Sequence, residues 1–221
     1  MKKKIKPSII TLTKETNEIQ RIITLKNNRQ KRHQYQEFVI EGHAAIDQAY
    51  ETGWEIKSFF FNKEIRLSDW AQNHLNNKNY ETAYAVSEQI MSKISDKTDS
   101  SELIAIAKMK VRHLTTHPMK SGDVIIVLDE PNSPGNLGMI IRSAVAFGAS
   151  ALVISGHSAD EYDPKCIRAS VGTFFSFPIY HVEGIKAFSK IIESLKTKRN
   201  VRVVASGDKG DITPQNSLFC R

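Results

Sequence analysis

A single arginine in an otherwise apolar stretch is the residue with the clearest potential for chemistry. Between Glu130 and Asp160, Arg142 is the only ionisable residue of fixed charge. It stands in a segment, residues 137–147, that is predicted to be a helix of mostly apolar side chains. A helix that is apolar on nearly all faces is buried, and an arginine is almost never buried without a partner. The sequence therefore predicts that this guanidinium faces a carboxylate in a structural ion pair, a nucleic-acid phosphate or a reacting oxygen.

The segments on either side of this helix are typical of a β-α-β unit. Residues 124–128 and 151–154 are short, continuous apolar runs, which indicate parallel strands covered on both faces. A turn rich in proline, serine and glycine follows the first run, and Asn136 then stands where a helix N-cap belongs. Gly148 suits the left-handed position that ends a helix. We expect Asn136 either to cap this helix or to hold the loop or a bound ribose.

Upstream, the pattern alternates between strand and helix. Residues 17–32 have apolar positions near helical spacing. Strands are predicted at 38–40, 56–61, 82–86, 103–107, 179–182 and 201–205, and helices at 43–52, 68–75, 87–94 and 185–195. Ser68 and Ser87 are the predicted caps of two of these helices. This order indicates a small three-layer α/β domain at the N-terminal end, followed by a linker and a second α/β unit.

The residues around Arg142 also resemble the first motif of the SpoU (TrmH-type) RNA 2′-O-ribose methyltransferases, a family of the knotted SPOUT superfamily. That motif places an asparagine, a glycine, an arginine and an Ala-Phe-Gly at the spacing of Asn136, Gly138, Arg142 and residues 146–148. Two other segments support the resemblance, which spans roughly residues 17 to 210. Residues 167–172 (IRASVG) resemble the family's Ala-Ser-x-Gly loop, and residues 38–42 (FVIEG) resemble its N-terminal substrate-binding domain.

The resemblance implies a fold and a division of the chain. The fold is α/β, with a small N-terminal RNA-binding domain and a C-terminal SPOUT-type (Rossmann-like) domain that carries a trefoil knot in the family. We place the RNA-binding domain at residues 1–113, a linker at 114–122 and the methyltransferase domain at 123–221. Within this scheme Glu41 and Ser170 are expected to contact RNA.

The implied reaction is methylation of a ribose 2′-OH in rRNA or tRNA with S-adenosyl-L-methionine as the methyl donor. In the family the motif's arginine is proposed to activate the hydroxyl. An arginine stays protonated in water and is a weak base, so the physical role expected of Arg142 is that of a fixed cation. Such a cation stabilises a developing alkoxide or clamps the adjacent phosphate. Asn136 is the second expected catalytic residue, and Gly138 allows either close backbone approach or tight helix packing.

The C-terminal end departs from the family pattern. Two later motifs, a Gly-x-Glu-x-Gly loop and an Ile-Pro segment with Ser-Leu-Asn-Val, are not found before Arg221. In the family they form the knot, most of the cofactor pocket and much of the contact in a homodimer. We expect a truncated form or fragment of a methyltransferase, with only the edge of the cofactor pocket present, at Ala205, Ser206 and Gly207. The alternative is a naturally short protein that binds RNA without catalysis.

Positive charge is concentrated near the N-terminus. Residues 1–40 contain ten Lys and Arg against three Glu, a net charge of +7, and the other residues hold 21 of each sign. This asymmetry indicates a polyanionic partner, with a solvated basic tail as the alternative. A cluster of cations comes just before Tyr35, an aromatic residue on which a base can stack. These cations, expected either to contact RNA or to form a solvated helix end, are Arg29, Lys31 and Arg32.

Other functional classes have less support. Two cysteines without a Cys-x-x-Cys predict no disulfide framework, which favours a cytoplasmic protein. No apolar run approaches the length of a membrane span, and no signal-peptide core follows the first lysines. His113 and His117 are four residues apart, but with no third ligand in sequence we expect no metal site. A dinucleotide Gly-x-Gly-x-x-Gly and a P-loop Gly-Lys-Ser/Thr are both missing.

Overall fold

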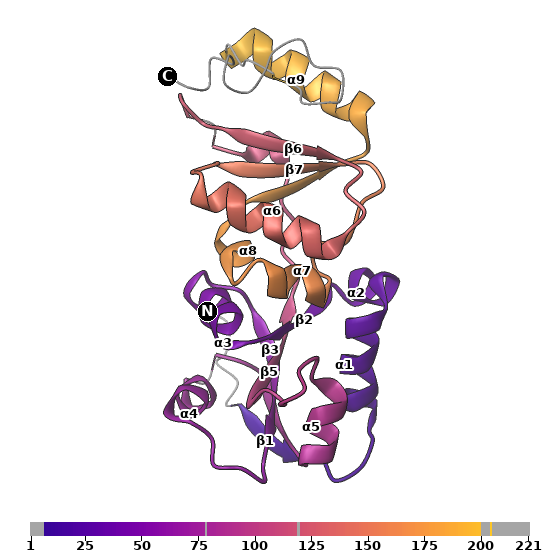
Figure 1. Ribbon diagram of the computed structural model, residues 1–221, viewed down its shortest axis with the longest axis vertical. Coiled ribbons are helices and arrows are strands. Elements are labelled where there is room, and N and C mark those ends of the chain that lie inside the picture. The colour runs from indigo at the N-terminus through magenta and orange to yellow at the C-terminus, as the bar shows by residue number, and fades with distance from the viewer. Residues whose placement is uncertain (1–6, 78, 119, 200–203, 205–221) are drawn as a thin grey trace.

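The computed structural model describes residues 7–77, 79–118, 120–199 and 204. Within them the chain forms two sheets that lie one above the other along the long axis of the molecule (Figure 1). Each sheet has helices on both of its faces, so both parts are layered α/β structures, as the sequence predicted. The described residues do not test the knot expected from the family, because the motifs that form it there are not found in this sequence. Among the described helices, none is both long and apolar enough to cross a bilayer.

The N-terminal sheet has five strands and contains both parallel and antiparallel neighbours. Their order is β1 (Ser8–Thr11), β4 (Thr82–Val86), β3 (Ile56–Asn62), β5 (Leu103–Lys108) and β2 (Glu37–Glu41). β1, β4 and β3 are parallel, whereas β5 runs antiparallel to both β3 and β2. Four of these strands confirm predicted segments. β1 was not predicted, because its four residues are all exposed and give no burial pattern.

Helices cover this sheet on both faces. α1 (Asn17–Asn27) and α5 (Glu88–Ile94) lie on one face, and α3 (His43–Glu51) and α4 (Asp69–Asn76) on the other (Figure 1). The alternation of strand side chains explains both cores, because Phe59 packs with the α3 side and Phe60 with the α1 side. The two predicted serine caps are confirmed: Ser68 Oγ accepts from Ala71 N and Ser87 Oγ from Ile90 N, each at 3.4 Å.

The predicted helix at 17–32 is instead two helices. α1 ends at Asn27, and α2 (Arg29–Tyr35) begins after an extended Asn28 with φ −128° and ψ 105°. Asn28 caps the second helix, because its side-chain oxygen accepts from Lys31 N at 3.0 Å. The break lets the chain turn toward the second sheet. The helical spacing of residues 17–32 contained no signal for it apart from the two consecutive asparagines.

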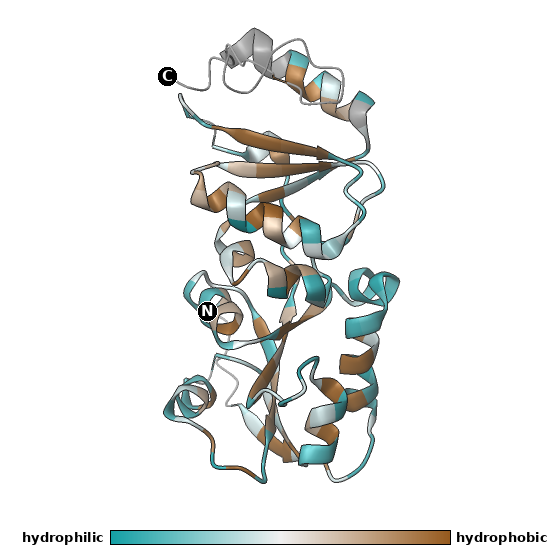
Figure 2. Cartoon of the chain, viewed as in Figure 1, coloured by the Kyte–Doolittle hydropathy of each residue, from teal (hydrophilic) through white to brown (hydrophobic). Residues whose placement is uncertain are grey.

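The C-terminal sheet has three described strands, all parallel. β7 (Ala151–Ser155) lies between β6 (Ile125–Asp129) and β8 (Ile179–Val182). The predicted linker contains a short 3-10 helix, η1 (Leu114–Thr116). α6 (Pro134–Ala146), α7 (Pro164–Ala169) and α8 (Thr173–Ser176) lie between the two sheets, and α9 (Ile185–Arg199) covers the far face (Figure 1). Strands of both sheets carry hydrophobic residues along their length (Figure 2).

The two sheets share one continuous core at their junction. Phe38 of β2 and Trp54 pack against Tyr162, Phe174 and Phe175 of the second half, with the Phe38 and Tyr162 rings 4.9 Å apart. Trp54 Nε1 also donates to Phe175 O at 2.9 Å, which satisfies the buried indole N–H. An aromatic core that crosses between the two halves fixes their relative position. Any ligand held at this junction therefore meets residues from both.

Candidate functional site

The outer face of α6 carries the motif arginine, and it is exposed. Arg142 lies on the exposed side of the helix together with Asn136, Met139, Ser143, Ala146 and Phe147. At about 100° per residue, these positions fall within one arc of roughly 140° around the helix axis. Met139 is 55% exposed and Phe147 is 90% exposed, so this arc displays apolar as well as polar groups. Figure 2 shows hydrophobic residues on the visible side of α6.

The prediction that Arg142 is buried in an apolar helix is therefore wrong. The opposite arc of α6, formed by Leu137, Gly138, Ile141 and Ala144, is the buried one. The sequence predicted burial on all faces because apolar residues occur on both arcs of the helix. Within the described residues no hydrogen bond or ion pair engages the Arg142 guanidinium. The internal carboxylate that would have made this arginine a structural ion pair is thus not found in that part of the chain.

Asn136 is not the cap of α6, which corrects a second expectation. The helix begins at Pro134, and Ser133 Oγ accepts from Asn136 N at 3.3 Å. Proline suits the first turn, because its missing N–H would have no partner there. The Asn136 side chain is exposed on the same arc as Arg142. Because capping is excluded, the remaining predicted roles of Asn136 are to hold the loop or a bound ribose.

Gly138 explains how α6 is held. A Cβ at this position would lie 2.8 Å from Ala169 Cβ and closer still to the Cys166 carbonyl oxygen of α7. Only a glycine allows this approach, so tight helix packing is the observed use of the residue. The contact fixes the buried arc of α6 and therefore the direction in which Asn136 and Arg142 point.

Arg32 is not exposed for RNA, contrary to the expectation from the basic cluster. Its side chain is 2% exposed, and Nε donates to Asp160 Oδ2 at 2.7 Å. It also pairs with Asp163 at 3.3 Å and donates to the last carbonyls of α1, at Leu25 and Lys26. Burial alone raises the pKa of Asp160, but its hydrogen bond to His33 and the charge of Arg32 outweigh that effect and lower the pKa. Arg32 therefore joins the two halves of the molecule.

The other two cations of the cluster remain at the surface. Arg29 is exposed and donates to Ser158 O, and Lys31 Nζ lies 5.7 Å from the centre of the Tyr35 ring. The sequence reading missed Arg21, whose guanidinium carbon lies 5.0 Å from the same ring. Tyr35 is 42% exposed and lies near both cations, of which Arg21 is also paired with Glu37 at 2.7 Å. The sequence contained no signal for Arg21, which is 14 residues from Tyr35, whereas Lys31 and Tyr35 are four residues apart on one helix.

The two remaining RNA expectations fall on structural residues. Ser170 is fully buried, and its hydroxyl donates to Ile167 O at 2.7 Å, so Ser170 does not contact RNA. Glu41 uses both carboxylate oxygens inside the protein, accepting from Ser95 Oγ and from Asp96 N at 2.9 Å. We assign it a positioning role at the end of β2, where it holds the 95–96 turn.

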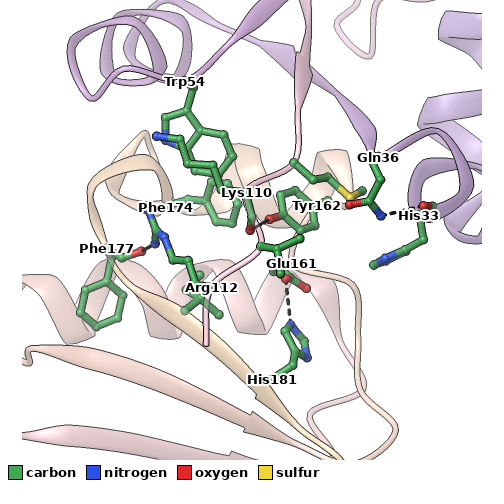
Figure 3. A pocket seen from close by; sticks show the side chains of 13 residues that line it. His33, Gln36, Trp54, Lys110, Arg112, Glu161, Tyr162, Phe174, Phe177 and His181 are labelled. Atoms are coloured by element: carbon green, nitrogen blue, oxygen red, sulfur yellow. Dashed lines mark hydrogen bonds and ion pairs between the residues drawn. The ribbon is translucent and has the colours of Figure 1, made fainter. Parts of the chain in front are cut away.

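A cavity of about 250 Å³ lies at the junction and was not predicted. We call it the junction cavity. It is lined by Trp54, Lys110 and Arg112 from the first half, and by Glu161 and His181 from the second (Figure 3). The aromatic rings of Tyr162, Phe174 and Phe177 complete its walls. This site could not be predicted from the sequence, because its residues are scattered over more than half of the chain.

Two expectations concern bound groups. The cofactor residues Ala205, Ser206 and Gly207 lie outside the described residues, so that prediction stays a prediction. Within the described part no three His, Cys, Asp or Glu side chains come together as metal ligands. His117 instead shares a hydrogen bond of 2.8 Å with the Tyr180 hydroxyl.

Comparison with known proteins identifies the class of this two-part α/β chain. Residues 17–105 match the SpoU L30e-like domain, and residues 123–218 match the SpoU rRNA Methylase family. The crystal structure of the SpoU methyltransferase AviRb from Streptomyces viridochromogenes in complex with AdoMet superimposes with a TM-score of 0.75 at 32% identity, covering 84% of this chain and 69% of that one. The chain belongs to the SpoU rRNA methylase family, which confirms the resemblance seen in the sequence.

Two curated relatives narrow the comparison. The chain is 34% identical over 177 residues to the 23S rRNA (uridine(2479)-2′-O)-methyltransferase of Streptomyces viridochromogenes, covering 80% of this chain and 61% of that protein. It is 23% identical over 168 residues to the 23S rRNA (guanosine(2553)-2′-O)-methyltransferase RlmP of Bacillus subtilis, covering 71% and 63%. The chain thus spans about three fifths of the length of each of these relatives.

Proposed function

We propose that this protein methylates a ribose 2′-OH of ribosomal RNA with S-adenosyl-L-methionine as the methyl donor. The observation that carries the proposal is membership of the family together with the exposure of both motif side chains, Asn136 and Arg142, on one arc of α6. Both named relatives act on the 2′-oxygen of a 23S rRNA nucleotide, which favours rRNA over tRNA. We also propose that the reaction takes place in the cytoplasm.

The chemistry asked of this chain is electrostatic. When bound, S-adenosyl-L-methionine supplies an electrophilic methyl carbon; we expect Ala205, Ser206 and Gly207 to form one edge of its pocket. Arg142 remains protonated at neutral pH, so it places a fixed positive charge where the 2′-oxygen becomes an alkoxide, or holds the neighbouring phosphate. Asn136 offers an amide donor and acceptor to the ribose. Since no described carboxylate neutralises Arg142, its charge is available for RNA.

We propose that the active form is a homodimer in which a second copy covers Met139 and Phe147 on the outer arc of α6 and leaves Arg142 open to the RNA. The support is the exposure of Met139 and Phe147 on the same arc as Arg142. A cover over these apolar groups would exclude water from the arginine, and electrostatic interactions strengthen when water is excluded. Phe147→Ser should therefore shift the sedimentation coefficient of the intact protein toward that of a monomer. An unchanged coefficient at micromolar concentration would contradict a dimer through this face.

We propose that the two halves divide the work, with residues 1–113 binding RNA, 114–122 as linker and 123–221 carrying methyl transfer. Support for the first role comes from Tyr35, whose ring centre lies 5.0 Å from the Arg21 guanidinium and 5.7 Å from Lys31 Nζ, with Arg29 in the same helix as Lys31 and Tyr35. Cations around an aromatic ring suit an unpaired base and its phosphate. RNA affinity should then fall steeply as salt is added.

The function is tested by replacing Arg142 with alanine in the full-length protein. Transfer of the labelled methyl group from S-adenosyl-L-methionine to unmodified rRNA should fall about 100-fold or more, because one fixed charge at the reacting oxygen is lost. The thermal unfolding midpoint should not change, since the side chain is exposed and has no described partner. Arg66→Ala, also at an exposed arginine, is the matched control and should methylate normally.

Two results would overturn the proposal. Retained methylation by Arg142→Ala would remove the assigned role from the motif arginine. A wild-type protein that binds rRNA but shows no calorimetric signal with S-adenosyl-L-methionine would instead indicate an RNA-binding module without catalysis.

A further inference from the structure

The junction cavity holds charged groups that the proposed reaction does not use. It lies between the two sheets, away from the outer arc of α6, and receives side chains from both halves (Figure 3). At about 250 Å³ it falls below the roughly 300–1,000 Å³ typical of pockets for drug-sized ligands. A group the size of one planar ring system fits this volume better than a whole cofactor. Its walls combine aromatic rings, two cations and one carboxylate.

The two cations share one aromatic surface. Lys110 Nζ lies 4.5 Å and the Arg112 guanidinium carbon 5.9 Å from the centre of a Trp54 ring. Their acceptors are neutral carbonyls: Lys110 Nζ donates to Thr52 O at 3.1 Å and Arg112 to Phe177 O at 2.7 Å. Burial, followed by the charge of Arg112, lowers the pKa of Lys110. Among the ion pairs of the described residues neither cation has a carboxylate partner, so an anion at this place would relieve their repulsion.

The carboxylate of Glu161 is also incompletely satisfied. The residue is 5% exposed, and Oε1 accepts from His181 Nε2 at 2.8 Å. Oε2 is buried and has no hydrogen-bond partner among the described residues. A buried polar atom without a partner costs about 1–3 kcal/mol, and more when it is charged. Because Oε2 is itself sealed from solvent, the carboxylate must rotate toward the cavity before a ligand N–H reaches it, and that contact would remove this cost.

We propose that the junction cavity receives one unpaired nucleotide of the RNA, a further recognition site besides the methylated ribose. Its phosphate would lie against Lys110 and Arg112, and its base would enter among the aromatic rings with an N–H edge toward Glu161. Guanine fits best, because it offers two adjacent N–H donors to a carboxylate, one for Oε2 and one that competes with His181 for Oε1. The inference rests on the proposed function in that RNA is the substrate. Because both halves contribute groups, this nucleotide sets how the RNA lies across the molecule.

Trp54 makes occupancy of the cavity directly measurable. The chain has two tryptophans, and Trp70 lies elsewhere, stacked on His43 at 3.9 Å. In a Trp70→Phe protein, Trp54 fluorescence is titrated with four trinucleotides of identical charge, UGU, UAU, UCU and UUU. We expect UGU to bind at least about fivefold more tightly than UUU, since a good paired donor–acceptor contact discriminates by this amount or more. Calorimetry of the wild-type chain with UGU and UUU gives the same comparison without the Trp70 substitution.

Two variants separate the contacts. Glu161→Gln keeps the shape of the side chain and should bring the UGU to UUU ratio close to one. Lys110→Met should weaken all four trinucleotides by a similar factor. It should also reduce the slope of log affinity against log salt by about 0.7, the value for one phosphate contact in a single strand. Lys63→Met, at an exposed lysine of the first half, is the matched control and should leave Trp54 titrations unchanged.

The outcomes distinguish this inference from the proposed function, because binding is measured without cofactor or methyl transfer. If the protein methylates rRNA but Trp54 responds to no trinucleotide, or if Glu161→Gln keeps the guanine preference, the junction site is overturned and the enzyme stands. If the trinucleotides behave as expected while rRNA is not methylated, the junction site stands and the proposed reaction fails.

Discussion

Two arginines of this chain lie in opposite environments. Arg142 is exposed on the outer arc of α6, beside Met139 and Phe147, with no described partner. Arg32 is buried at the junction between the sheets, where two aspartates and two backbone carbonyls receive its N–H groups. A charge that holds a fold together is one whose partners lie inside the same chain. A charge on a helix surface without an internal partner is free to bind a ligand. Substitution of Arg32 should therefore lower stability, whereas substitution of Arg142 should lower activity.

The largest difference is expected in stability. Arg32→Met should lower the free energy of unfolding by about 3–5 kcal/mol, because it leaves the Asp160 carboxylate buried without its arginine, beside only His33 and the Tyr162 N–H. The measurement is urea denaturation followed by circular dichroism. Arg29→Met serves as control, since Arg29 is exposed, and should cost less than about 1 kcal/mol. A small loss for both variants would mean that the junction is not held by this ion pair.

A second prediction tests whether the direction of α6 depends on its buried arc. Gly138→Ala places a Cβ against the backbone of α7 and should cost about 1–3 kcal/mol through overpacking. Gly135→Ala is the matched control, because a Cβ there meets nothing within 4 Å and alanine favours a helix by up to about 1 kcal/mol. Thermal unfolding of both variants gives the comparison. If the two glycines behave alike, the α6–α7 contact does not fix the motif face.

The same pair of arginines shows how far the sequence could be used. Alternating apolar segments predicted the layers, and the caps at Ser68 and Ser87 came from local rules that hold in the structure. The motif at 136–148 was found because its residues are contiguous. The ion pair of Arg32 with Asp160 joins positions 128 residues apart, and the sequence around either residue does not indicate the other. For the same reason the junction cavity stayed hidden until the fold was known.

The smallest expected effect is a pH dependence that the junction has and the α6 face lacks. Partial burial lowers the pKa of His181, because it disfavours the charged ring. The hydrogen bond and the charge of Glu161 outweigh burial and raise the pKa of His181 above the ordinary 6.5. The charge of Arg29 lowers this pKa and that of Asp160 raises it. A raised folded-state pKa gives stability that is fully present below pH 6.5 and is lost as the pH rises through the folded value. His181→Gln should remove this slope from unfolding free energies measured between pH 5.5 and 8.5, using buffers spaced by about half a pH unit.

Since the His181 side chain is 42% exposed, the loss should be no more than about 1 kcal/mol, as for other screened pairs. His113→Gln, at an exposed histidine, should keep the wild-type slope. Arg142→Ala should keep it too, because the α6 face carries no titrating pair among the described residues.

A guanine edge at Glu161 would compete with His181 for the carboxylate, so bound UGU should change the slope of the wild-type protein and leave that of His181→Gln unchanged. A slope that UGU does not alter would separate the histidine pair from the nucleotide site.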